Sequence, residues 1–412
     1  MSAGPKDVGA EHASTVLAYV GSYADESDRG GITPLLVGDG GASLAPQKPV
    51  TAPDQAGYLA YRPSTATMYA VDERKTDGRG PVQPPAAVHA FTVGEGGRLT
   101  QLSTAPALGP FPTYLVVVEG RDLLVSISHG SFEHIERVVR DPDGTWHTEY
   151  VYDDSTVVCY ALDDDGGIGA VSDVQVLEGH GVDPNPSPQA GGHGQASAHA
   201  HCAVVDPSGR YLLVTDKSTD RIYVFEIDRQ LRQVSVYQAP PVTGPRHLVF
   251  HPRQSRLFAT YEFSSQLVSL DFDPSTGTLT AIDAISTVAG DPGRLNEPAD
   301  IHIHPRGDVV YVNNRGEDSL AWFDVSSDGY LTRRGQVQLG ESIHPGLAAR
   351  SFAVDPEGAF LLVADRPSGL VRSYSIGTDG ALSPLAEVTV PNPAAVIIPS
   401  PTDNGQYEGA AS

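Results

Sequence analysis

Short apolar runs alternate with turn-forming residues along almost the whole chain. The runs are rich in Val, Leu, Ile, Tyr and Phe, and the 43 Gly and 33 Pro residues are spread between them instead of clustering in one linker. Short β-branched and aromatic runs separated by Gly and Pro are typical of β-strands joined by turns. The pattern therefore predicts an all-β protein.

One sequence pattern occurs four times in the second half of the chain. In each copy a short strand ends near a proline, a second strand follows, and two more strands come after a polar turn. The copies cover 201–234, 247–282, 301–331 and 351–385, with the marker prolines Pro207, Pro252, Pro305 and Pro356. These prolines are 45, 53 and 51 residues apart, close to the spacing of about 40 to 50 residues for one blade of a β-propeller.

Weaker copies at 58–102 and 114–171 raise the number of blades to six, and the second of them is stretched by an insertion between its second and third strands. The segment 16–44 lacks the first strand of a blade, while 394–398 has the pattern of a strand but belongs to none of the repeats. Pairing the two pieces closes the ring and removes an exposed sheet edge. We therefore predict a seven-bladed β-propeller that is closed by pairing of the N- and C-terminal strands.

The propeller prediction assigns residues 15–400 to one domain, with disordered segments at 1–14 and 401–412. No apolar run is long enough to span a membrane, and residues 1–14 lack the apolar stretch of a secretory signal. A cytoplasmic location is expected. Cys159 and Cys202 lie in strand-like runs and are predicted to be buried core residues.

The charge balance narrows the possible partners. The chain has 27 Lys and Arg against 51 Asp and Glu, a net charge of −24. This excess repels nucleic-acid backbones and anionic membranes, so neither is an expected partner. A small-molecule lactone or carboxylate remains possible if the binding site is locally positive, and the sequence leaves the choice between monomer and dimer open.

The blade topology predicts where the chemistry lies. In an antiparallel blade the first strand begins, and the second strand ends, on the same face. Polar residues at these places should meet at one mouth of the central channel: Glu73, His129, His199, His201, Asp216, Arg246, Glu262, Asp300, Asn314, Arg315, Arg350, Asp365 and Arg366. The two longest irregular stretches, 129–155 and 178–198, should leave on this face and form a partial lid.

Motifs at these places occur together in a fixed order. They are Gly21-Ser22-Tyr23, Gly179-His180-Gly181 with Asn185-Pro186, Ala198-His199-Ala200-His201, Gly244-Pro245-Arg246-His247, Tyr261-Glu262, and Asn314-Arg315-Gly316 with Asp318-Ser319. With this set the chain resembles the propeller lactonase family, typified by bacterial 6-phosphogluconolactonase and including the fungal carboxymuconate cyclases. The segments 128–155 and 187–197 depart from the family pattern beside the expected site, so the resemblance does not fix the substrate.

The resemblance implies a seven-bladed propeller with no cofactor or required metal. It also implies an active site containing a histidine, a glutamate and arginines at the channel mouth. The histidine falls on His199 or His201, the glutamate on Glu262, and the arginines on Arg246 and Arg315.

Each of these residues has a catalytic and a structural interpretation. A neutral His199 or His201 could accept a proton from the attacking water, or one of them could hold a loop. Arg246 could stabilise an oxyanion or bind an anionic substituent, and could also pair with Glu262. Glu262 follows an apolar strand, so burial is expected to raise its pKa and suit it to protonating the leaving alkoxide. Its structural interpretation is a carboxylate in a surface turn, and its place beside the channel argues against this.

A second group of residues is expected to bind substrate: Glu73, His129, His180, Asn314, Arg350 and Arg366. A zinc site formed by the histidines is the less favoured alternative, because no His or Glu recurs at metal-ligand spacing in a rigid element.

Three functions remain open at this point. The leading hypothesis is hydrolysis of a sugar-type lactone by water. A lactonizing cycloisomerase would use the same groups in reverse, and a non-catalytic scaffold is also compatible with a propeller. The charged mouth favours an enzyme over a scaffold.

Overall fold

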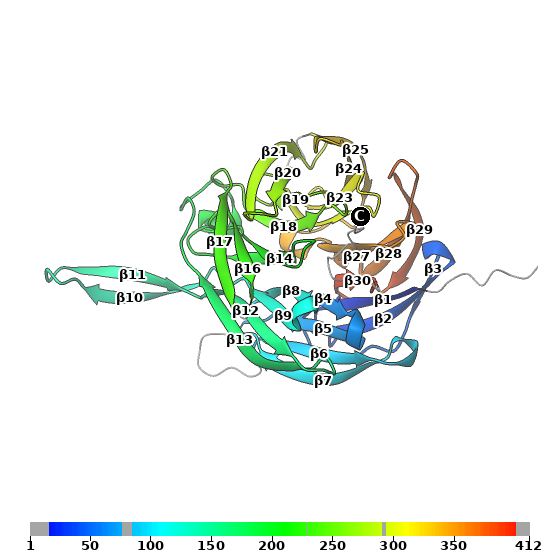
Figure 1. Cartoon of the computed structure of the whole chain (residues 1–412), viewed down its shortest axis with the longest axis horizontal. Helices are drawn as coiled ribbons and strands as arrows, with labels where there is room; N and C mark the ends of the chain where they lie inside the picture. Colours follow the sequence, from blue (N-terminus) through cyan, green and yellow to red (C-terminus); the bar gives the residue numbers. More distant parts are fainter. Residues whose placement is uncertain (1–15, 76–84, 229, 291–293, 401–412) are drawn as a thin grey trace, which may run out of the picture.

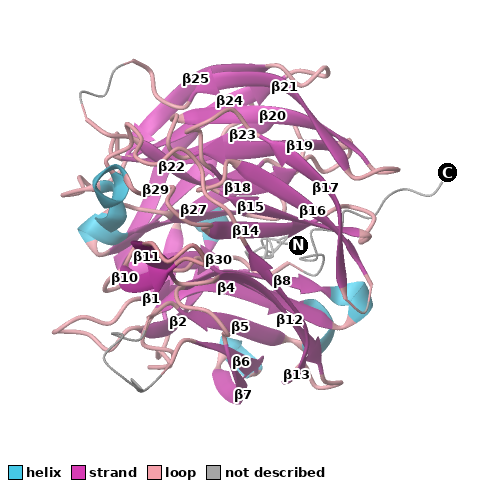
Figure 2. Ribbon diagram, turned by 90° about the vertical axis from the view of Figure 1, so that its left-hand side faces the viewer, coloured by secondary structure: helices cyan, strands magenta, loops and turns pink. Residues whose placement is uncertain are grey.

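The computed structural model describes residues 16–75, 85–228, 230–290 and 294–400. Their strands form seven four-stranded antiparallel sheets arranged around a centre, together with one two-stranded sheet (Figure 1). Helical structure in the described residues is limited to 3-10 turns of three or four residues in the connections (Figure 2). None of these helices is long and apolar enough to cross a membrane. The predicted all-β, seven-bladed fold is confirmed, whereas the predictions for residues 1–14 and 401–412 lie outside the described residues.

Six blades follow the chain in order. The first three of them comprise β4 (Ala56–Arg62), β5 (Thr67–Asp72), β6 (Ala87–Val93) and β7 (Leu99–Pro106); β8 (Pro112–Val118), β9 (Leu123–Ser128), β12 (Ser155–Leu162) and β13 (Ile168–Leu177); and β14 (Ala200–Val205), β15 (Tyr211–Asp216), β16 (Arg221–Ile227) and β17 (Leu231–Gln238). The next three comprise β18 (Pro245–Phe250), β19 (Arg256–Tyr261), β20 (Gln266–Asp273) and β21 (Thr278–Ser286); β22 (Glu297–Ile303), β23 (Val309–Arg315), β24 (Ser319–Val325) and β25 (Leu331–Gln338); and β26 (Ser351–Val354), β27 (Phe360–Asp365), β28 (Leu370–Ile376) and β29 (Leu382–Thr389).

The seventh blade joins the two ends of the described chain. Its strand order is β3 (Ser43–Pro46), β2 (Gly31–Gly38), β1 (Val16–Ser22) and β30 (Pro393–Ile397). Strand β30 pairs antiparallel with β1, with Val396 opposite Val20. The predicted closure is therefore confirmed, and it covers the edge that β1 would otherwise expose.

The marker prolines follow residues that cap the turn between the first two strands. Asp206 accepts hydrogen bonds from the backbone N–H groups of Arg210 and Tyr211, at 2.9 and 2.6 Å. In two other blades a histidine takes this place, and the ring Nδ1 atoms of His251 and His304 each accept an N–H at 3.0 Å. The repeated pattern thus forms a turn in which the side chain before the proline accepts hydrogen bonds from backbone N–H groups.

The core consists of apolar layers between neighbouring sheets. Large side chains such as Tyr69, Tyr160 and Phe258 are fully buried in these layers. Cys159 and Cys202 are both buried and free, as predicted.

The long insertion in the second of these six blades differs from the prediction. Residues 129–155 were expected to be irregular and to cover the mouth, but they contain a hairpin of β10 (His134–Arg140) and β11 (Trp146–Tyr152). The hairpin, which we call the arm, projects away from the propeller (Figure 1). The turn Asp141-Pro142-Asp143-Gly144, with Gly144 at φ 92°, accounts for this regular structure, because Pro-Asp-Gly between β-forming runs favours a hairpin.

Candidate active site

A cavity of about 400 Å³ lies where the predicted mouth residues meet. It is lined from the first strands of several blades, at Thr113, His201 and Arg246, and from the ends of second strands, at Glu262 and Arg315. The topological rule for locating the mouth therefore holds. The base of the arm contributes Gly130, Ser131, Phe132 and Glu133 to the cavity wall, while its tip points away.

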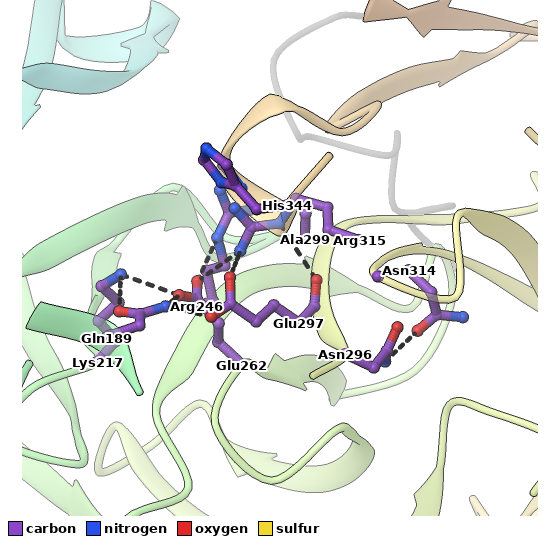
Figure 3. Close-up of polar contacts among 12 residues, drawn as sticks. Gln189, Lys217, Arg246, Glu262, Asn296, Glu297, Ala299, Asn314, Arg315 and His344 are labelled. Carbon is purple, nitrogen blue, oxygen red and sulfur yellow. Dashed lines mark hydrogen bonds and ion pairs between the residues drawn. The ribbon is translucent and has the colours of Figure 1, made fainter. Parts of the chain in front are cut away.

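Glu262 is the centre of a buried charge cluster beside this cavity (Figure 3). Its carboxylate lies 2.7 Å from Arg246 Nε, 3.0 Å from Lys217 Nζ and 3.2 Å from Arg315 Nη2. The amide of Gln189 also donates to it, so the segment 178–198 reaches the mouth as predicted.

The expected raised pKa of Glu262 is wrong. Burial by itself raises this pKa, but Lys217, Arg315 and Arg246 together lower it well below the usual value. The side chain is therefore an ionised acceptor near neutral pH. It holds the three cations in place and has no proton to give to a leaving alkoxide.

Arg246 is 2% exposed, which is more buried than its predicted place at an open channel implied. It lines the cavity, and its Nη1 atom has no hydrogen-bond partner among the described residues. Burial and the neighbouring Arg315 lower the pKa of Arg246 to about 10, so the guanidinium is still charged at neutral pH. This arrangement combines a fixed positive charge with an unused donor.

Arg315 is held by a residue that the sequence analysis missed. Its Nε donates to the backbone oxygen of Glu297 at 3.2 Å, and its Nη2 lies 3.3 Å from the Glu297 carboxylate. Gln189 donates to the same carboxylate at 2.8 Å. Glu297 begins β22, whereas the sequence analysis placed the start of this blade at residue 301 and therefore selected Asp300.

The two candidate histidines have different surroundings. The ring of His199 stacks on His129 at a centroid distance of 4.4 Å, and its Nδ1 donates to the His129 backbone oxygen at 2.9 Å. His201 lines the cavity instead, and its Nδ1 is buried without a hydrogen-bond partner among the described residues. His199 thus holds a loop, whereas His201 faces the space in which a substrate would lie.

The imidazole of His201 is kept neutral by its surroundings. Burial, Arg246 and His247 lower its pKa well below the ordinary value. Behind it, His247 donates from Nδ1 to Asp300 at 2.9 Å, and His302 lies 3.4 Å from the other oxygen of that carboxylate. A neutral imidazole can accept a proton from water.

The second group of predicted residues divides between the cavity and its surroundings. Glu73, His129 and Arg350 line the cavity, and Arg350 pairs with Glu73. Arg366 is not part of the cavity wall; it lies over the ring of Tyr23, 4.7 Å from its centroid.

The structure does not bring His180 or Asn314 into the cavity, contrary to their prediction as substrate-binding residues. His180 is exposed, and its ring contacts the backbone oxygen of Gly181. Asn314 donates to Thr287 and Ser319 and accepts from Asn296. Figure 3 shows the Asn296–Asn314 contact apart from the Glu262 cluster. Asn314 therefore ties connections together.

Two lysines of the cavity wall were also missed. Lys217 directly follows β15, as Glu262 follows β19 and Glu73 follows β5, so the rule pointed to this position although we chose Asp216. Asp216 instead accepts the backbone N–H of His199 and supports the loop. Lys75 lies in the connection after β5, and its ammonium group pairs with Glu133 and Asp153 of the inserted segment.

The described part of the chain holds no group of three or more His, Cys, Asp or Glu side chains arranged to bind a metal ion. The cavity wall contains two imidazoles, three guanidinium groups and two ammonium groups, those of His129, His201, Arg246, Arg315, Arg350, Lys75 and Lys217.

Comparison with known proteins adds to this geometry. The model of the family "Lactonase, 7-bladed beta-propeller" matches residues 17–398. A 6-phosphogluconolactonase from Bacillus subtilis (strain 168) is 25% identical over 385 residues, which cover 92% of this chain and 97% of that protein.

Solved structures agree on the fold. A protein from Lactobacillus plantarum is 28% identical, with a TM-score of 0.76 and coverage of 93% of this chain and 99% of that one. A periplasmic gluconolactonase from Pseudomonas aeruginosa is 24% identical, with a TM-score of 0.75 and coverage of 94% and 100%. The family resemblance seen in the motifs is confirmed: the chain belongs to the seven-bladed β-propeller lactonase family.

Proposed function

We propose that this protein hydrolyses a sugar-type lactone in the cavity beside Arg246 and His201. The observation that carries the proposal is the buried Arg246. Glu262 holds its guanidinium in place, and its Nη1 atom has no hydrogen-bond partner among the described residues. A donor of this kind suits the oxyanion that develops when water attacks a lactone carbonyl. The 6-phosphogluconolactonase and gluconolactonase among the similar proteins support the same reaction class.

In the proposed mechanism the neutral His201 accepts a proton as water adds to the carbonyl carbon. Arg246, oriented by Glu262, stabilises the oxygen that becomes negative, and Arg315 supplies a second positive charge nearby. The tetrahedral intermediate then collapses, the ring C–O bond breaks, and His201 returns its proton to the leaving alkoxide. Glu262 is a positioning residue in this scheme, because it stays ionised.

The chemistry of the site favours hydrolysis over lactonizing cycloisomerisation. Cycloisomerisation in the predicted form needs a general acid to protonate the substrate. Glu262 is held ionised and His201 is held neutral, so neither residue is a ready acid at neutral pH.

The class of ligand, the cellular location and the oligomeric state are also part of the proposal. The cavity suits a small molecule, and the net charge of −24 disfavours nucleic acid and anionic membranes. A cytoplasmic location is proposed on the sequence alone, and the choice between monomer and dimer stays open.

The test is a ring-opening assay with glucono-1,5-lactone and with 6-phosphogluconolactone, corrected for spontaneous hydrolysis. We expect acceleration of at least one of the two by the wild-type protein and its loss in His201→Gln. Absence of acceleration on both lactones, with a folded protein, would contradict the proposed function.

A further inference from the structure

We propose that the site takes a neutral, non-phosphorylated sugar lactone in preference to a phosphorylated one. This inference rests on the proposed function and adds the class of substrate. It comes from the partners of the five cationic side chains that line the cavity, Lys75, Lys217, Arg246, Arg315 and Arg350. Each of them already contacts at least one carboxylate of the protein.

Lys75 has no donor left for a ligand. Its ammonium group donates to Ser131 Oγ at 2.7 Å and lies 2.9 Å from Glu133 and 2.8 Å from Asp153. An ammonium carries three protons, and these three partners use all of them. A phosphate could bind Lys75 only by displacing one of its present partners.

Arg350 is engaged in a similar way. Its Nη1 and Nη2 atoms donate to the two carboxylate oxygens of Glu73, and Nη2 also contacts the backbone oxygen of Gly57. A bidentate pair of this kind occupies the edge of the guanidinium that a phosphate would otherwise use.

The remaining three cations share two carboxylates. Lys217, Arg246 and Arg315 contact Glu262, and Arg315 also contacts Glu297. In this cluster Arg246 Nε, Arg246 Nη1 and Arg315 Nη2 make no hydrogen bond among the described residues. Of these, Arg246 Nε and Arg315 Nη2 lie within ion-pair distance of Glu262, at 2.7 and 3.2 Å. A donor such as Arg246 Nη1 matches a single carbonyl oxygen, whereas a phosphate presents three acceptor oxygens.

The charges of the site lead to the same result. The five cations face five carboxylates, those of Glu73, Glu133, Asp153, Glu262 and Glu297. A phosphomonoester brings about −1.5 to −2 charges at neutral pH, and the five cations carry no positive charge in excess of the carboxylates that they contact. The overall net charge of −24 also slows the approach of a dianion.

The inserted segment supplies part of this balance. Glu133 and Asp153 lie at the two ends of the arm, immediately before β10 and after β11. They neutralise Lys75 at the cavity wall. The insertion therefore removes a cation that could otherwise bind a phosphate.

The experiment compares kcat/KM for glucono-1,5-lactone and 6-phosphogluconolactone in the full-length protein. It also compares the binding of the products gluconate and 6-phosphogluconate by calorimetry. We expect kcat/KM to be about tenfold or more higher for the neutral lactone, and 6-phosphogluconate to bind no more tightly than gluconate.

The double variant Glu133→Gln/Asp153→Asn tests the cause. It keeps the shape of both side chains but frees the charge of Lys75, so the preference for the neutral lactone should fall by about tenfold. The control variant Glu136→Gln/Glu149→Gln removes the same number of charges from exposed positions on the arm and should leave the preference unchanged.

The possible failures are distinguishable. Tighter binding of 6-phosphogluconate than gluconate, or an equal or higher kcat/KM for the phosphorylated lactone, would overturn the inference. An equal change in both double variants would overturn the assignment to Lys75, because it would show an effect of overall charge. Absence of turnover of both lactones would overturn the proposed function, and the product-binding comparison would still decide the preference.

Discussion

The rings of His201 and His247 lie 5.1 Å apart between two neighbouring blades, with His201 on the cavity side. His247 is fixed by its Nδ1 hydrogen bond to Asp300, which belongs to a third blade. Three successive blades thus contribute to the position of one imidazole. Burial, Arg246 and His247 all disfavour a positive charge on His201, so the same arrangement also keeps that ring neutral.

The first prediction separates the two histidines of the Ala-His-Ala-His motif. His201→Gln should lower kcat by about 10²- to 10⁴-fold, the usual contribution of a general base, with the melting temperature nearly unchanged. His199→Gln should affect stability more than chemistry, since His199 holds the loop of His129. Steady-state kinetics and thermal melting of both variants check this, and a larger loss of kcat in His199→Gln would reverse the assignment.

The second prediction concerns the pH dependence of activity. His201 acts in its neutral form, and its pKa is lowered well below 6.5. Protonation on acidification therefore begins only at a pH well below 6.5, so kcat/KM should stay level from about pH 8 to 6 and decline under more acidic conditions. A profile of kcat/KM between pH 5 and 8 tests this. An acidic limb centred near pH 6.5 would contradict it.

The third prediction concerns Arg246. Arg246→Ala should lower kcat by about 10²- to 10³-fold, as expected for the loss of an oxyanion-stabilising donor. Arg246→Lys serves as the matched variant, because it keeps the charge but loses the planar fork, and it should restore only part of the activity. Wild-type turnover in a folded Arg246→Ala protein would exclude this residue from the mechanism.

The fourth prediction concerns the stability of the charge cluster. Glu262→Gln leaves Lys217, Arg246 and Arg315 without their shared carboxylate and should destabilise the protein by about 3–5 kcal/mol near neutral pH. The pKa of Glu262 is lowered in the folded state, so the unfolded chain binds the proton first on acidification. The stabilisation is complete above the unfolded value of about 4.3 and is lost as the pH falls below it.

Denaturant unfolding of the wild type and Glu262→Gln at pH 7, 5 and 3.5 measures this difference. The gap in unfolding free energy should be similar at pH 7 and 5 and smaller at pH 3.5. A gap that widens on acidification would show that the sign of the pKa shift is wrong.

The fifth prediction tests the closure of the ring. Val396 is 6% exposed in β30, so Val396→Asp should bury an unpaired charge and destabilise the protein by about 3 kcal/mol or more. Val138 on the arm is 75% exposed, and Val138→Asp should change stability by less than about 0.5 kcal/mol. Equal melting temperatures of the two variants would contradict a closing role for β30.

The propeller could be predicted from the sequence because its signals are local and repeated. The residue before a marker proline, such as Asp206 or His251, caps the turn that follows, and this pattern recurs at the spacing of a blade. The N-terminal segment lacks one strand of a four-stranded blade, which predicts that a C-terminal strand pairs with β1. The sequence analysis did not predict the arm, although Asp141–Gly144 is a hairpin signal. Almost all residues of β10 and β11 are exposed, so these strands lack the buried apolar face that marks the propeller strands.

The chain by itself determined the fold, the face on which the mouth lies, and most residues around it, including His201, Arg246, Glu262 and Arg315. Only the tertiary structure decided their ionisation and their pairing. The pKa of Glu262 depends on Lys217 and Arg315, which come from two other blades, and Lys75 is neutralised by Glu133 and Asp153 from the inserted segment. Electrostatic interactions act over a few ångströms in space regardless of separation along the chain, so no sequence pattern records them.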